Sequence, residues 1–188
     1  MKIQSIITVA IFGGLFMLSS CGDEALMPTT PVEEEMEEME MENNENTASL
    51  KAAPDFSIKT WDNEDLKYED YNDRVLVIWF FGSDCPPCKA IGPSVEEKLN
   101  KNFRGKEDYA IIGIDQWDRN NATIEGFKKT TGIEFPLGAM GSGVASDYET
   151  TYDRLVVVNK EGKIAYKADS RATNNIDDVV DIAKELAN

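Results

Sequence analysis

The sequence contains no histidine and only three cysteines among its 188 residues. Without histidine there is no imidazole to bind a metal ion or to act as a general base near neutral pH, so two common kinds of catalytic site are excluded. Basic residues are also scarce: 19 Lys and Arg stand against 35 Asp and Glu, for a formal net charge of −16. A basic surface that binds nucleic acid is therefore not expected.

The negative charge is concentrated near the N-terminus. Residues 22–50 contain ten acidic residues and no Lys or Arg, which leaves 25 acidic and 18 basic residues in the remainder from residue 51 onward. Like charges repel, and few of these side chains can be buried, so we expect residues 21–52 to form an acidic disordered tether. Three methionines among the glutamates of residues 33–42 suggest a weaker alternative, a copper(I) site, because thioethers bind this ion. They are Met36, Met39 and Met41.

The first 20 residues have the pattern of a secretory signal. Lys2 supplies a positive charge, and residues 3–18 are mostly apolar but too short to span a membrane. The segment ends in Leu-Ser-Ser-Cys21, which resembles the lipobox of bacterial lipoproteins. This resemblance implies that Cys21 is lipidated, although a plain signal peptide with an incidental cysteine is the alternative. We expect a lipid-anchored, extracytoplasmic protein of the bacterial cell envelope, on the inner or the outer membrane.

From residue 53 onward, strand patterns alternate with helix patterns. Runs of β-branched and aromatic residues predict strands at 56–60, 65–68, 74–81, 109–115, 155–159 and 163–166. Apolar residues at helical spacing predict helices at 85–101, from 121 or 123 to about 129, and at 175–187. The glycine-rich stretch 137–143 is expected to be a loop. This alternation predicts an α/β domain with a mixed sheet between two outer layers.

Cys85 and Cys88 lie where a buried strand passes into a helix. Pro86 and Pro87 between them fit the first helical turn, where an N–H group has no partner within the helix. A helix N-terminus favours a thiolate over a thiol, so this position suits thiol redox chemistry. A structural disulfide or half of a zinc site is the alternative. A disulfide that closes so small a loop stabilises little, and a structural zinc site needs four ligands.

Together these features resemble the thioredoxin superfamily, and most of all its membrane-tethered TlpA-like and redoxin-like thiol–disulfide oxidoreductases. The resemblance is carried by Ala53–Ile58, Val77–Lys89, Pro93, Phe135–Leu137 and Leu155–Ile164. It implies a thioredoxin-like three-layer α/β/α sandwich with a mixed central sheet over residues 53–188. It also implies that Cys85 is an exposed nucleophile that attacks a substrate disulfide, and that Cys88 then attacks Cys85 and releases the reduced substrate. Two intervening residues keep both sulfurs within disulfide reach.

The resemblance further implies a monomeric enzyme without cofactor or metal. Its partners would be protein thiols and disulfides of the cell envelope, and an upstream membrane reductant or oxidant would recharge the pair. Such tethered proteins are often reductants. Two alternatives stay open: a non-catalytic binding module with this fold, and a peroxiredoxin-like peroxidase. Gly82 disfavours the peroxidase, because peroxiredoxins carry a threonine three residues before the reactive cysteine.

Three departures from the family pattern concern the surroundings of the pair. Asp84 replaces the usual aromatic residue; its carboxylate would either disfavour the Cys85 thiolate or cap the helix, and the two effects can coexist. Trp79 and Ile91 occupy the positions of two acids found in relatives, so proton transfer to Cys88 would rely on water or on an acid elsewhere. Asp153, or Arg154 with a one-residue gap, stands at the family's cis-proline. We expect a trans peptide bond there, and we hypothesise that Arg154 approaches Cys85 and partly offsets Asp84.

Overall fold

The computed structural model describes residues 50–188, so the predicted signal peptide, Cys21 and nearly all of the predicted tether lie outside the described residues. Contacts of the domain begin at Lys51, two residues before the predicted boundary. The Lys51 carbonyl accepts a hydrogen bond from the N–H of Ile164 at 2.9 Å, and the N–H of Ala53 donates to the Gly162 carbonyl at 2.9 Å. Within residues 50–188, no helix has the length and apolar character needed to cross a membrane.

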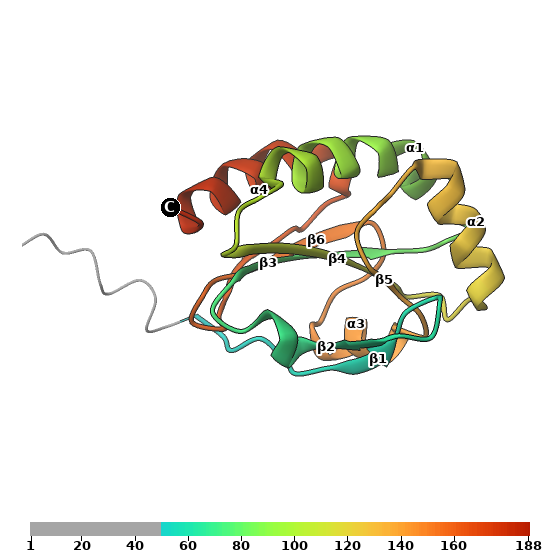
Figure 1. The fold of residues 1–188 in the computed structure, drawn as a ribbon, viewed down its shortest axis with the longest axis horizontal. Helices are drawn as coiled ribbons and strands as arrows, with labels where there is room; N and C mark the ends of the chain where they lie inside the picture. Colours follow the sequence, from blue (N-terminus) through green and yellow to red (C-terminus); the bar gives the residue numbers. More distant parts are fainter. Residues whose placement is uncertain (1–49) are drawn as a thin grey trace, which may run out of the picture. The chain divides into compact units, whose positions relative to one another are not determined.

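A mixed sheet of five strands forms the middle layer, in the order β5-β4-β3-β6-β7 (Figure 1). The strands are β3 (Val75–Phe81), β4 (Tyr109–Asp115), β5 (Leu137–Gly138), β6 (Arg154–Val158) and β7 (Ile164–Lys167). The central strand β3 pairs in parallel with β4 and antiparallel with β6. All of its side chains are buried, because both faces of the sheet are covered. Four of these strands were predicted, and each lies within one residue of its predicted bounds.

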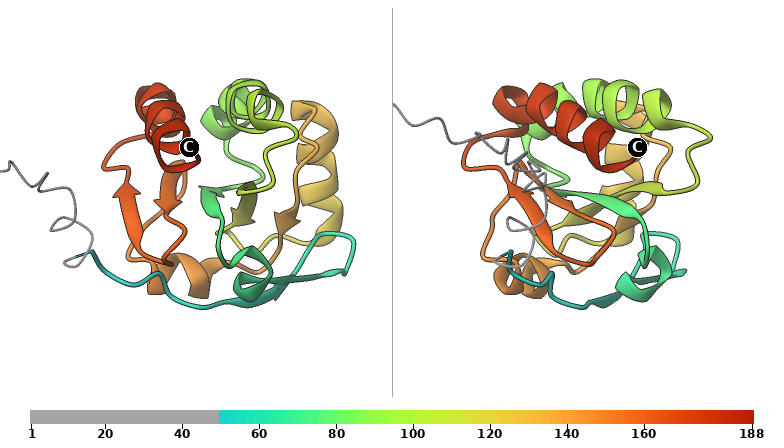
Figure 2. Two further views of the ribbon diagram at one scale, coloured as in Figure 1. Left: turned by 60° about the vertical axis from the view of Figure 1, so that its left-hand side comes forward. Right: turned by 90° about the vertical axis from the view of Figure 1, so that its left-hand side faces the viewer.

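Three helices cover one face of the sheet (Figures 1 and 2). They are α1 (Pro86–Val95), α2 (Asn121–Thr131) and α4 (Ala172–Leu186). Their apolar side chains pack with alternate residues of β3, including Trp79, and both cysteines belong to this cluster. The first helix contains Pro93 and continues as a π-helical turn at Glu96–Asn100 and a 3₁₀ turn at Lys101–Phe103, so the predicted helical extent is confirmed.

A smaller layer covers the opposite face, where Leu76, Ile78 and Phe80 of β3 point. It consists of α3 (Ser142–Asp147), a 3₁₀ turn at Tyr68–Tyr71, and a two-stranded antiparallel sheet of β1 (Ser57–Lys59) and β2 (Asp65–Lys67). In Figure 1 these elements lie below the sheet, and α1 and α4 lie above it. The three-layer α/β sandwich is therefore present, with a second outer layer built partly from strands.

The loop expected at 137–143 is a wrong prediction, because this stretch contains β5 and the start of α3. Gly138 makes β5 possible in a crowded place: a Cβ atom there would lie 2.5 Å from Cδ1 of Ile58. The strand is short, and its glycine hides the apolar pattern on which a strand prediction relies. The last helix also begins at Ala172, three residues earlier than expected.

Candidate active site

Cys85 is the N-cap residue of α1, at the end of the loop that follows β3. Its Sγ atom accepts a hydrogen bond from the backbone N–H of Cys88 at 3.3 Å, and its own N–H donates to the Gly82 carbonyl at 2.9 Å. Pro86 and Pro87 occupy the first helical positions, which need no donor. The helix thus presents both an N–H group and the positive end of its dipole to this sulfur, an arrangement that stabilises a thiolate.

Both cysteines are buried, with 1% of Cys85 and 0% of Cys88 exposed. The expectation of an exposed Cys85 is therefore wrong for this conformation. Trp117 packs against the apolar cluster that contains both cysteines. Its indole lies directly on Gly82, where a Cβ atom would come within 2.6 Å of the ring, and it contacts the edge of Tyr152 with ring centroids 4.9 Å apart. Aromatic cover next to the cysteine loop is a tertiary feature that the local motif does not reveal.

The thiol of Cys88 is held in its neutral form. Burial raises its pKa most, and the hydrogen bond with Cys85 and the negative charge of Asp153 raise it further, against a backbone hydrogen bond with Gly82. The two sulfurs therefore differ: Cys85 lies at the positive end of the helix, while Cys88 keeps its proton in the core. This asymmetry is what a nucleophile and a resolving thiol require.

Asp84 lies on the exposed side of the cysteine loop and forms two ion pairs. Its carboxylate is 3.1 Å from Nε of Arg119 and 3.9 Å from Nζ of Lys89. The Arg119 guanidinium also lies over the ring of Trp117, 5.8 Å from its centroid. The structure does not support capping by Asp84, because the N-cap residue is Cys85. Arg119 was not singled out from the sequence, since it follows a different strand.

Arg154 does not take the role expected of it. Its Nη1 atom donates to the carbonyl of Asp153 at 3.2 Å, and its side chain lines a cavity of about 460 Å³ with residues 149–151 and 167–169. Arg154 is the first residue of β6, where it pairs with Phe80 of β3. It lies two residues before Val156, and the side chains of Phe80 and Val156 face away from the cysteine helix. Strand alternation thus places Arg154 on the other side of the sheet, and the cations beside Asp84 are Arg119 and Lys89.

Asp153 precedes β6 and is buried, with 1% exposed. Its Oδ1 atom accepts a hydrogen bond from the indole N–H of Trp79 at 3.2 Å, while Oδ2 has no hydrogen-bond partner. Burial raises the pKa of this carboxyl group, and the Trp79 hydrogen bond and the charges of Arg171 and Arg154 oppose the increase. The backbone has φ 46°, and no peptide bond within residues 50–188 is cis, as expected.

Asp115, at the end of β4, is a further site residue that the sequence reasoning missed. It is fully buried, and its carboxylate accepts the backbone N–H of Ser83 at 2.7 Å and that of Arg119 at 2.9 Å. It thereby fixes the cysteine loop to the loop that follows β4. Burial raises its pKa, and these hydrogen bonds oppose the shift. Its position in the sequence could have identified it, because it ends the strand next to the one that leads into the cysteines. Adjacent parallel strands end at the same edge of a sheet.

A family profile described as the AhpC/TSA family matches residues 50–167, most of this domain. The chain belongs to the AhpC/TSA family. It is 26% identical over 113 residues to thioredoxin-like protein YneN of Bacillus subtilis, and the matched segment covers 60% of this chain and 66% of that protein. It is 24% identical over 120 residues to thiol-disulfide oxidoreductase ResA of Bacillus cereus, covering 62% and 67%. The matches thus span about two thirds of each relative's length.

The structure of a thiol:disulfide interchange protein of the thioredoxin family, from Chlorobium tepidum, superposes with a TM-score of 0.63. The superposition covers 74% of this chain and 97% of that one, at 18% identity, a level that shows the fold alone. The predicted membership of the thioredoxin superfamily and the predicted fold are therefore confirmed for this AhpC/TSA-family chain.

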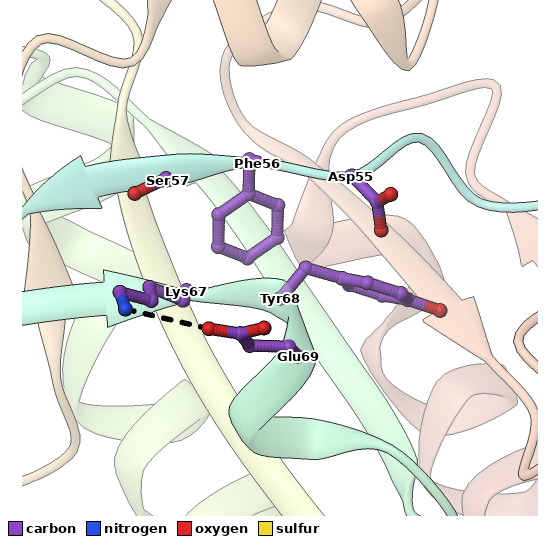
Figure 3. Close-up of a pocket in the computed structure, with 6 residues that line it drawn as sticks. All are labelled: Asp55, Phe56, Ser57, Lys67, Tyr68 and Glu69. Carbon is purple, nitrogen blue, oxygen red and sulfur yellow. Dashed lines mark hydrogen bonds and ion pairs between the residues drawn. The ribbon is translucent and has the colours of Figure 1, made fainter.

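This AhpC/TSA-family domain also has a cavity of about 440 Å³ beside β1 and β2 (Figure 3). It is lined by Asp55, Phe56, Ser57, Lys67, Tyr68 and Glu69. The rings of Phe56 and Tyr68 meet edge to face, and Lys67 forms an ion pair with Glu69 at 3.3 Å. Phe56 and Tyr68 belong to the cluster on the opposite face of the sheet, so this cavity is separate from the cysteine site.

Proposed function

We propose that this protein is a thiol–disulfide oxidoreductase whose Cys85–Cys88 pair exchanges with cysteine pairs of other proteins. The observation that carries the proposal is the hydrogen bond from the Cys88 N–H to the Cys85 Sγ at the start of α1. Family membership and the names of the two relatives support it. The Cys85 thiolate attacks a substrate disulfide and forms a mixed disulfide. Cys88 then attacks the Cys85 sulfur, which oxidises the pair and releases the substrate as two thiols.

We propose that the pair works as a reductant. The disulfide form of a cysteine pair is a strong oxidant when the reduced form of the pair is stabilised as a thiolate. Here burial and the charge of Asp153 destabilise the Cys88 thiolate. Ionisation of Cys88 therefore does not stabilise the reduced pair, and only Cys85 at the helix N-terminus can do so, which limits the oxidising power of the disulfide and supports a role in donating electrons.

We also propose that a lipid on Cys21 anchors the protein outside the cytoplasm, in the bacterial cell envelope. The support is in the sequence: the short apolar segment that ends in Leu-Ser-Ser-Cys21, and the acidic stretch that separates Cys21 from the first contacts of the domain at Lys51. A single acyl chain gives only marginal membrane binding, so stable anchoring needs more than one.

Reduction of insulin disulfides by dithiothreitol tests the proposed activity. We expect the wild type to accelerate it, Cys85→Ser to abolish the acceleration, and Cys88→Ser to accumulate a mixed disulfide with the substrate. Background rates for both the wild type and Cys85→Ser would instead support a binding module. Consumption of peroxide without reduction of insulin would support a peroxidase.

A further inference from the structure

Only one of the two carboxyl oxygens of Asp153 has a hydrogen-bond partner in the interior of the domain. Oδ1 accepts the indole N–H of Trp79, whereas Oδ2 is buried without a partner. Burying a carboxylate with a free oxygen is unfavourable, and most buried polar atoms have a partner. The Trp79 hydrogen bond does not explain why this residue is an acid, because the oxygen of an asparagine would accept it equally well.

The position of Asp153 relates it to Cys88. Trp79, which holds Oδ1, pairs with Leu155 across β3 and β6. Trp79 and Leu155 pack in the same apolar cluster as Cys88. The negative charge of Asp153 raises the pKa of the Cys88 thiol, which is itself fully buried. Cys88 must lose a proton before it can attack, and bulk water does not reach a buried thiol.

We propose that Asp153 takes up the proton of Cys88 when Cys88 attacks the mixed disulfide on Cys85, and returns it in the reverse direction. This inference rests on the proposed oxidoreductase function. It assigns to Asp153 a part in the chemistry that neither of the two acids beside the cysteine loop can supply, because Asp84 is turned outward to Arg119 and Asp115, at the end of β4, is engaged by two backbone N–H groups.

The step balances as follows. The Cys88 S–H bond breaks, its proton moves to the Asp153 carboxylate, and the sulfur forms a bond to Cys85 Sγ. The bond between Cys85 and the substrate sulfur breaks, and the substrate leaves as a thiolate with that electron pair. Cys85 and Cys88 end as a disulfide, and the substrate disulfide has been reduced by two electrons. The Asp153 proton then passes to the departing thiolate or to water.

The charged and titratable groups around Asp153 fit this role. Arg171, before α4, and Arg154, on β6, act on the carboxyl group and favour its charged form, and the charge of Asp153 in turn acts on Cys88 of α1. Burial opposes the charge. With these opposing effects, the carboxyl group binds a proton more readily than an exposed one does. A group that accepts a proton from a thiol of raised pKa needs this property.

A pH-jump experiment isolates the step. The reduced protein is loaded on Cys85 with 4,4′-dithiodipyridine at about pH 4, then moved to pH values between about 5 and 9, and release of the second thiopyridone is followed by absorbance. In the wild type we expect the release rate to reach a plateau once Asp153 is ionised. In Asp153→Asn we expect the rate near neutral pH to fall about tenfold or more and to rise in proportion to hydroxide across the range.

Two controls complete the design. Trp79→Phe removes the hydrogen bond but keeps the acid, so its pH profile should retain a plateau. Asp55→Asn removes an exposed acid at the cavity on the opposite face of the sheet, so its second release should match the wild type. The inference is overturned if wild-type release rises with hydroxide without a plateau, a measurement that needs no variant, or if Asp153→Asn keeps the plateau. If thiopyridone never appears in a second step even in the wild type, the proposed function itself fails.

Discussion

The indole N–H of Trp79 and the Oδ1 atom of Asp153 form a hydrogen bond of 3.2 Å in the interior between β3 and β6. The two residues are 74 positions apart in the chain. The bond connects the strand that leads into the cysteines with the corner that precedes β6. It places a carboxyl group inside the core on the side of the sheet where Cys85 and Cys88 lie.

Replacing Asp153 by asparagine should stabilise the protein more at neutral than at acid pH. Burial raises the pKa of this carboxyl group in the folded state above its ordinary value of 3.8. The protonated form therefore favours folding, and this contribution is lost as pH rises through the folded-state pKa. We expect the difference in unfolding free energy, variant minus wild type, to increase between about pH 4 and pH 7 in urea titrations. A constant or decreasing difference would contradict the prediction. The raised pKa of Asp115 cancels, because both proteins keep this residue.

Asp115 should be essential for the shape of the cysteine loop. Asp115→Ala leaves the N–H groups of Ser83 and Arg119 without their acceptor. A buried donor without a partner costs about 1–3 kcal/mol, so we expect a loss of about 2 kcal/mol or more in unfolding free energy, with slower insulin reduction. Asp118→Ala is the matched control, since it removes hydrogen bonds to Ser142 at an exposed site. Equal losses in the two variants would show that Asp115 is not special.

Trp117 should limit access to Cys85. In a Cys88→Ser background, only Cys85 of the described domain can react with iodoacetamide. We expect Trp117→Ala to increase the alkylation rate about tenfold, as removal of about 1.4 kcal/mol from an opening free energy would do. Gly82→Ala should have the same direction of effect, because its Cβ atom would displace the indole. The control is Trp61→Ala, which removes a ring that packs against the same cluster. If Trp117→Ala and Trp61→Ala both react at the wild-type rate, Trp117 does not limit the access of iodoacetamide to Cys85.

Membrane association should depend on Cys21. We expect the full chain, expressed in a bacterium, to be labelled with fatty acid and to sediment with membranes. Cys21→Ser should lose the label and move to the soluble fraction, because the proposed acyl anchor is removed. Sedimentation of the variant with membranes to the same extent as the wild type would contradict lipid anchoring at this residue.

Apart from β5 and α3, the strands and helices of the described domain were predictable because their signals are local. Runs such as Val75–Phe81 can be buried only within a sheet covered on both faces, and Cys85–Pro86–Pro87–Cys88 after such a run indicates a helix start. The surroundings of the pair depend instead on residues brought together from distant segments. Arg119 reaches Asp84 from the loop after β4, and Asp153 reaches Trp79 from the corner before β6. The sequence pattern alone does not show whether Arg154 or Arg119 lies beside Asp84, because this depends on which face of the sheet each side chain takes.

The burial of Cys85 has a consequence for chemical damage. A thiolate open to solvent is readily converted by peroxide to sulfenic acid and then, irreversibly, to higher oxides. With 1% of the residue exposed, the resting pair is shielded from such small oxidants. A protein substrate that displaces the indole of Trp117 would gain access only for the duration of one encounter. In the proposed location outside the cytoplasm, where oxidising conditions prevail, this shielding would let the proposed reducing dithiol survive between reactions.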